Sequence, residues 1–168
     1  MAQLRKILNS ILNVLAGGSF LVMVVLTCWQ VFTRYILKNP SSWSEELVGY
    51  MFAWMSLFGA ALVVGERGHM NIPVLVERFG MGARKFFAIF AEIIACLFAA
   101  IILVFGGWQI AQLAMGQMTS SLGVAIGVFY WVMPVCGVVN VLYTIMNIIE
   151  ICNGTISLKT ADELEKEA

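Results

Sequence analysis

The stretch of sequence that decides the fold is WSEELVGYMFAWMSLFGAALVVG, residues 43–65. After two adjacent acids, Glu45 and Glu46, it continues for 19 residues, Leu47 to Gly65, without a formal charge. At about 1.5 Å per residue, such a run is roughly 28 Å long as a helix, close to the hydrocarbon thickness of a bilayer. The stretch therefore predicts a membrane-spanning helix.

Small side chains recur along one side of this predicted helix. The residues that share the i, i+4, i+7, i+11 spacing of a single helical face are Gly49, Ala53, Ser56 and Ala60. Small residues at this spacing let a second helix approach closely inside a membrane. We expect this face to pack on protein. The alternative is chance, because glycine and alanine are common in membrane spans.

The composition assigns the whole chain to the membrane. Hydrophobic residues make up 61% of the 168 residues and charged residues only 12%, whereas soluble domains carry about 25% charge. The predicted spans are residues 14–32, 43–65, 86–108 and 124–149. Pro134 is expected to kink the last span. The sequence thus predicts one all-α integral membrane domain, residues 1–168, with four transmembrane helices.

Residues 3–15 have an amphipathic pattern that allows three interpretations. The segment could lie flat in the membrane interface, or it could form the first turns of one long tilted helix. A cleaved signal peptide is the third interpretation. The apolar run continues to about Phe32, however, and no A-x-A cleavage site is present.

A second amphipathic segment follows the second span. Residues 71–79 place apolar side chains at i, i+3, i+4 and i+7, with Asn71 as an N-cap candidate and Gly80 as a helix stop. We expect a short interfacial helix there. The charged tail, residues 153–168, is expected to fray.

Basic residues are distributed unequally between the two sides of the membrane. With four spans, the N-terminus, the second loop and the C-terminus share one side and hold eight Lys and Arg residues. The other side holds only Arg34 and Lys38. The positive-inside rule then predicts that both termini lie in the cytoplasm.

Polar side chains inside the predicted spans are candidates for helix packing or subunit contact. Glu92 lies about six residues into the third span, where placing a carboxylate in the membrane costs free energy. It could reach back to the interface or to Lys85, pair with a basic residue of a partner helix, or couple to protons. Asn140, Tyr143 and Asn147 form a polar stripe that could hydrogen-bond within the bundle or face another subunit.

No residue pattern in the sequence indicates a catalytic, cofactor or metal site. His69 is the only histidine, and it is expected to cap a helix end or pair with a carboxylate such as Glu66. The four cysteines include no CxxC pair. Acidic and basic residues balance at ten each, so the charge predicts no nucleic-acid partner. We expect a protein that is not an enzyme and has no cofactor of its own.

Residues 34–72, RYILKNPSSWSEELVGYMFAWMSLFGAALVVGERGHMNI, combine several features in order. An Arg-Tyr pair ends the first span, Trp-x-Glu-Glu opens the second, a Trp and a Gly-Ala pair follow, and a Gly-His pair comes after. The residues concerned are Arg34, Tyr35, Trp43, Glu45, Glu46, Trp54, Gly59, Ala60, Gly68 and His69. This order resembles the small membrane subunit of tripartite ATP-independent periplasmic (TRAP) transporters. The chain differs from that pattern at Gly49, where relatives often carry a basic residue, and at Pro73, where they often carry an acid.

The resemblance implies a scaffold role in the bacterial inner (cytoplasmic) membrane, among membrane lipids. In this family the small subunit binds a much larger membrane subunit that carries the substrate and sodium sites. A soluble periplasmic binding protein delivers an organic acid, such as sialic acid or a C4-dicarboxylate, and a sodium gradient drives uptake. Sodium is therefore expected on the large partner and not on this chain.

Two other classes of membrane protein fit the sequence less well. A small self-contained exporter working as a homo-oligomer would use a membrane carboxylate, for which Glu92 is the one candidate. Dual-topology exporters also need a weaker Lys and Arg bias. A quinone or haem redox enzyme would need paired cysteines or paired histidines, which the sequence lacks.

Overall fold

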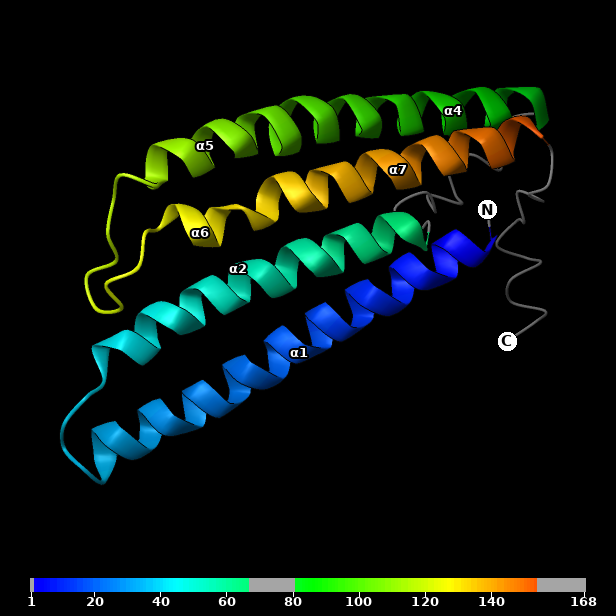
Figure 1. Cartoon of the computed structure of the whole chain (residues 1–168). Coiled ribbons are helices and arrows are strands. Elements are labelled where there is room, and N and C mark those ends of the chain that lie inside the picture. The colour runs from blue at the N-terminus through cyan, green and yellow to red at the C-terminus, as the bar shows by residue number, and fades with distance from the viewer. Residues whose placement is uncertain (1, 67–80, 154–168) are drawn as a thin grey trace, which may run out of the picture.

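The computed structural model describes residues 2–66 and 81–153, and these residues form long helices (Figure 1). The elements are α1 (Ala2–Tyr35), α2 (Ser42–Gly65), α4 (Met81–Phe98), η2 (Ala99–Gly106), α5 (Gly107–Ala114), α6 (Gly127–Tyr130) and α7 (Val132–Cys152). The π-helical segment η2 joins α4 to α5 in one continuous third span, and α6 with α7 makes the fourth. Among the described residues, four such helices are long and apolar enough to cross a membrane. The predicted all-α membrane fold is confirmed.

The first span is one uninterrupted helix of 34 residues, α1. Residues 3–15 are therefore its first turns, and they do not form a separate interfacial helix. The buried and half-buried side chains along α1 include Asn9, Leu12, Ala16, Ser19, Met23, Leu26, Gln30 and Thr33. They alternate by three and four residues, which is the spacing of closely packed helix pairs. The neighbour on this side is α2 (Figure 1).

The third span approaches the fourth closely through glycines. A Cβ added at Gly137 would lie 2.9 Å from the backbone nitrogen of Val104 in η2, and one added at Gly107 would lie 3.2 Å from the backbone nitrogen of Pro134. Among the buried and half-buried positions here, one series recurs every fourth residue: Ala99, Leu103, Gly107 and Ala111. A π-helix has more residues per turn than an α-helix. The wider turns thus keep this four-residue series directed at the fourth span.

The fourth span is interrupted near its proline. Trp131 separates α6 from α7, one turn before Pro134. Since proline has no N–H, the carbonyl of Tyr130, four residues earlier, has no helical donor at this position. The irregularity expected at Pro134 is therefore found at Trp131.

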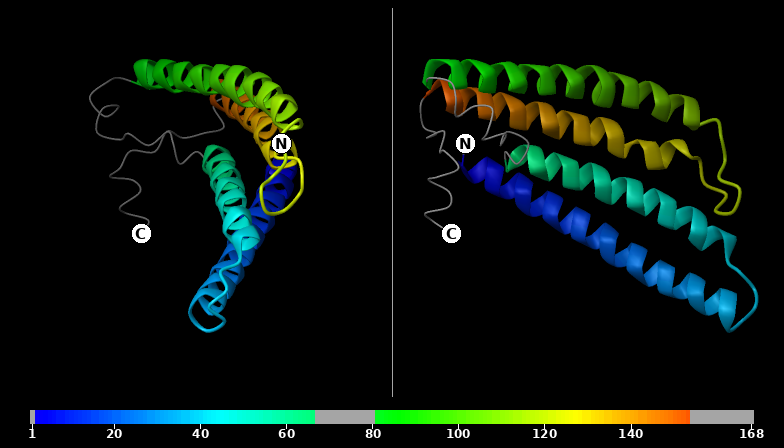
Figure 2. Two further views of the ribbon diagram at one scale, coloured as in Figure 1. Left: turned by 90° about the vertical axis from the view of Figure 1, so that its left-hand side faces the viewer. Right: turned by 180° about the vertical axis from the view of Figure 1, so that it is seen from behind.

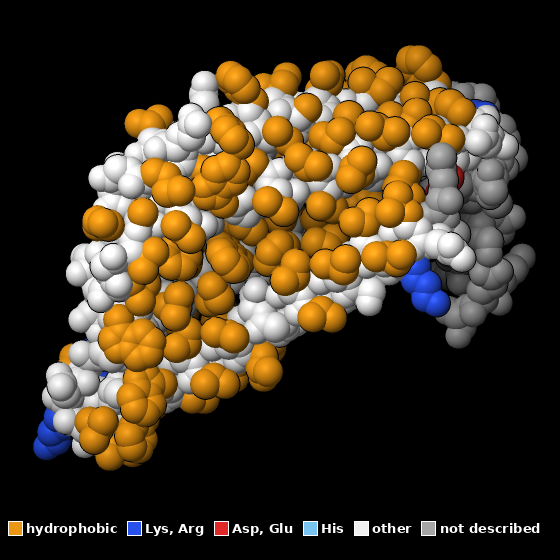
Figure 3. All heavy atoms as spheres, in the orientation of Figure 1, with side chains coloured by type: hydrophobic (Ala, Val, Ile, Leu, Met, Phe, Trp, Pro, Cys, Tyr) orange, Lys and Arg blue, Asp and Glu red, His pale blue; other side chains and the backbone are white. Residues whose placement is uncertain are grey.

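The helices form one curved layer and not a closed four-helix bundle. The central helix, α7, lies between α2 and the third span, and α1 lies outside α2 (Figure 1); Figure 2 shows the same order from two other sides. Half of the apolar window of the fourth span is buried, against 17% for α2 and 11% for α1 and for the third span. Figure 3 shows hydrophobic side chains across the visible face of the layer, with basic side chains at its ends. Much apolar surface of α1, α2 and the third span is therefore left for lipid or another protein.

Helix termini gather at the two ends of the layer. The Arg5 end holds the start of α1, the end of α2, the start of α4 and the end of α7 (Figure 1). The Trp43 end holds the α1–α2 connection and the α5–α6 connection. The predicted interfacial helix at 71–79, His69 and the tail beyond Asn153 lie outside the described residues.

Candidate subunit-contact surfaces

The small-residue stripe of α2 faces away from the other described helices. Its members Gly49, Ala53, Ser56 and Ala60 are all exposed. A Cβ added at Gly49 would meet no atom within 4 Å. The Ser56 hydroxyl donates to the carbonyl of Phe52 at 2.8 Å, so its polar group is satisfied within α2. The stripe is thus a smooth surface that a further helix could approach closely.

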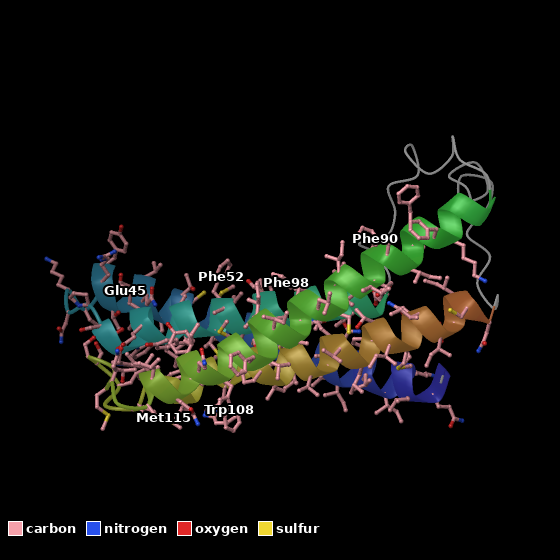
Figure 4. All side chains as sticks on the ribbon, turned by 90° about the horizontal axis from the view of Figure 1, so that it is seen from above. Glu45, Phe52, Phe90, Phe98, Trp108 and Met115 are labelled. Carbon is pink, nitrogen blue, oxygen red and sulfur yellow. The ribbon has the colours of Figure 1, made fainter. Side chains whose placement is uncertain are left out.

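The bulky neighbour of the stripe is Phe52, which is 58% exposed. Figure 4 labels it on α2, between Glu45 at the Trp43 end and Phe90 near the Arg5 end. Small side chains beside a large exposed aromatic ring give this face a shape that a partner could recognise.

At the Trp43 end, the two predicted acids have different surroundings. Glu46 accepts a hydrogen bond from the backbone nitrogen of Ser121 at 3.0 Å and thereby ties α2 to the α5–α6 connection. Glu45 is exposed, as are Trp43 and Arg34. Exposed charge and an aromatic ring at a helix end suit contact with a soluble or membrane partner. Glu46 instead contributes to the packing of the chain itself.

Contacts that the sequence did not reveal join α2 to α6. The indole Nε1 of Trp54 donates to the carbonyl of Phe129 at 2.9 Å. The rings of Tyr50 and Phe129 stack with centroids 4.0 Å apart. Trp54 lies near the middle of the span predicted at residues 43–65. That position was the only available signal of a buried partner, since an indole N–H inside a membrane needs an acceptor.

The polar stripe of α7 faces other helices of the chain. Asn140, Tyr143 and Asn147 are 8%, 0% and 0% exposed. The Tyr143 hydroxyl donates to Asn9 Oδ1 of α1 at 2.5 Å. The Asn147 amide nitrogen lies 3.4 Å from the carbonyl oxygen of Val64 in α2. Tyr143 and Asn147 therefore link α7 to α1 and α2.

Glu92 has a hydrogen-bond partner on α7. Its side chain is 4% exposed, and its Oε1 accepts a hydrogen bond from Asn147 Nδ2 at 2.8 Å. Lys85 instead donates to the carbonyl of Cys152 at 3.3 Å, at the end of α7. Glu92 is thus a helix-packing residue, placed to join α4 to α7.

The described residues contain no group of three or more His, Cys, Asp or Glu side chains that could hold a metal ion. The four cysteines, all within the described part of the chain, are free thiols.

Comparison with known proteins decides the family. Residues 23–154, which include parts of all four spans, match the family described as "Tripartite ATP-independent periplasmic transporters, DctQ component". The chain belongs to this family. The resemblance carried by residues 34–72 is confirmed, and the expectation that the chain is not an enzyme is confirmed as well, since this family consists of transporter components.

Individual relatives of this DctQ-family chain carry more specific names. It is 30% identical over 160 residues to the "Sialic acid TRAP transporter small permease protein SiaQ" of Vibrio cholerae, covering 94% of this chain and 92% of the relative. It is 35% identical over 87 residues to the "C4-dicarboxylate TRAP transporter small permease protein DctQ" of the same organism, covering 52% and 37%. It is 26% identical over 95 residues to the "Sialic acid TRAP transporter permease protein SiaT" of Haemophilus influenzae, covering 55% of this chain but only 15% of that protein.

Proposed function

We propose that this DctQ-family chain is the scaffold subunit of a TRAP transporter that takes up an organic acid of the sialic acid or C4-dicarboxylate class. The observation that carries the proposal is the exposed small-residue stripe of α2, on a layer that leaves its broad faces open. A larger membrane subunit would cover the stripe. That subunit would also carry the substrate and sodium sites, and a sodium gradient would drive uptake.

The SiaT relative supports a large partner. The segment that is similar to this chain makes up 15% of that permease, so it is covalently joined to a much longer protein. Covalent joining holds both parts in one assembly at fixed stoichiometry. We infer that this chain makes the corresponding contact without a covalent link.

The Trp43 end is proposed to face the periplasm. Lys and Arg number eight in the segments on the Arg5 side and two on the other, which favours a cytoplasmic Arg5 end and cytoplasmic termini in the bacterial inner membrane. The exposed side chains of Arg34, Trp43 and Glu45 would then be available to a soluble binding protein that delivers substrate.

Reporter fusions test this orientation. We expect green fluorescent protein fused after Ala168 to be fluorescent and alkaline phosphatase fused there to be inactive, because the phosphatase needs the periplasm for its disulfides. Alkaline phosphatase fused after Asn39, following the first span, should be active. An active phosphatase after Ala168 would show that the termini lie in the periplasm and that the proposed orientation is wrong.

Uptake by reconstituted vesicles tests the scaffold role. Vesicles that contain this chain alone, with an inward sodium gradient, should accumulate no labelled sialic acid or C4-dicarboxylate above empty vesicles. The reason is that Glu92, Tyr143 and Asn147, three polar side chains within its spans, are engaged in hydrogen bonds between its own helices. Vesicles that also contain the large subunit and the binding protein should take up one of these acids. Uptake by the chain alone would favour a self-contained transporter and remove the scaffold proposal.

A further inference from the structure

A polar cluster joins α1, α4 and α7 at the Arg5 end. It consists of Arg5 on α1, Glu92 on α4, and Asn147 and Glu150 on α7. We propose that this cluster, the Arg5 clamp, holds the amphipathic first turns of α1 against α7 and keeps them from lying flat on the membrane surface.

Asn147 is the centre of the Arg5 clamp. Its Oδ1 accepts a hydrogen bond from Arg5 Nη2 at 2.5 Å, and its Nδ2 donates one to Glu92 Oε1 at 2.8 Å. The amide oxygen thus faces the cation while the amide nitrogen faces the carboxylate. One side chain thereby stabilises both charges, since charge-assisted hydrogen bonds of this kind are stronger in a buried, low-dielectric site.

Arg5 has a second anionic partner at the end of α7. Its Nη2 lies 3.3 Å from Glu150 Oε2, and both side chains are 21% exposed. The last turn of α7 also carries the partial negative charge of a helix C-terminus. One turn further along α1, Asn9 accepts the hydrogen bond from Tyr143. The electrostatic environment at the end of α7 therefore favours a docked Arg5.

Apolar packing does not decide where these first turns lie. Leu12 belongs to the core cluster, and Leu8 packs against it. In a bilayer, however, lipid chains offer such side chains contacts that are equally apolar. An amphipathic segment with basic residues is also stable in the membrane interface. Polar contacts therefore determine whether residues 3–15 pack against α7 or lie in the membrane interface.

Glu92 increases the free-energy difference between the docked position of residues 3–15 and their position in the membrane interface. If Arg5 left with α1, it would regain water at the membrane surface, whereas Glu92 would remain on α4 inside the third span. A membrane-buried carboxylate that loses a nearby cation becomes more costly to keep dehydrated. Docking of α1 is thus coupled to the charge of Glu92 through Asn147.

Hydrogen exchange on the full-length chain in lipid nanodiscs tests the clamp. Arg5→Ala is expected to raise the exchange of backbone amides in residues 3–15 about tenfold, because a hydrogen bond to a charged group is lost and the remaining carboxylate draws water inward. In the double variant Arg5→Ala/Glu92→Gln, exchange in residues 3–15 should fall to within about threefold of the wild type. The substitution removes the charge at position 92, while the side-chain oxygen of the glutamine still accepts a hydrogen bond from Asn147.

Arg34→Ala is the matched control, because it makes the same change at the other end of α1, where Arg34 is exposed. It should leave exchange in residues 3–15 unchanged. The clamp is overturned if Arg5→Ala behaves like Arg34→Ala, or if Glu92→Gln does not reverse the effect of Arg5→Ala. If the Arg5→Ala variant does not accumulate in the membrane, the amount of folded chain is compared instead between Arg5→Ala and the double variant Arg5→Ala/Glu92→Gln. Recovery in the double variant supports the clamp, and failure to recover overturns it.

Discussion

Gly49→Leu and Ala53→Leu are each expected to reduce co-purification of this chain with the large membrane subunit about tenfold. Both positions are exposed on the small-residue stripe, so a leucine there does not clash with the described helices of the chain. A partner helix that packs against small residues would be displaced, at a cost of about 1–3 kcal/mol for overpacking. The measurement is a pull-down from membranes that contain both subunits, normalised to the amount of this chain, with sodium-driven uptake as a second readout.

Gly17→Leu on α1 is the matched control for this experiment. Gly17 is exposed, and a Cβ added there would also meet no atom within 4 Å. The substitution therefore adds the same volume to a membrane helix without affecting the stripe. It should co-purify at the wild-type level. If the two stripe variants do so as well, α2 does not contact the large subunit through these residues, while the family membership is unaffected.

The four spans could be predicted from the sequence because long uncharged apolar runs leave the backbone few alternatives in a bilayer. The expected span 43–65 corresponds to α2, Ser42–Gly65. The first turns of α1 could not be decided, because residues 3–15 have a pattern that suits both an interfacial helix and a packed one. The choice depends on Asn147 and Glu150, more than 130 residues later in the chain.

Other features depend on contacts that a single sequence does not reveal. The π-helical segment AAIILVFG contains no residue that marks a change in helical repeat, and its close contact with Gly137 is set by the packing of two spans. The bond from Trp54 to Phe129 joins residues 75 apart. For Glu92, the sequence left the interface, Lys85 and a basic residue of a partner helix open, and it gave no sign of the amide of Asn147 on another helix, which donates to it in the structure. The spacing of the small-residue stripe was visible, but its exposure follows from the open layer.

Gly127→Ala is expected to destabilise the chain by about 1–3 kcal/mol, although alanine is the better helix former. A Cβ at Gly127 would lie 2.5 Å from the carbonyl oxygen of Ala111 and 2.7 Å from the backbone nitrogen of Met115. Because both are backbone atoms at the end of α5, no side-chain rotation relieves the clash, and α6 must move away. The midpoint of thermal unfolding in detergent, followed by circular dichroism, should therefore fall.

Gly17→Ala should shift the same midpoint in the opposite direction. The position is open, so the change removes the conformational freedom of a helical glycine and should stabilise the chain by about 0.5–1 kcal/mol. Equal midpoints for the two variants would contradict the close approach of α5 and α6. The close contact between α5 and α6 also stabilises the position of α2, because it places Phe129, whose carbonyl accepts the hydrogen bond from Trp54. Gly127→Ala should accordingly raise hydrogen exchange in α2, whereas Gly17→Ala should not.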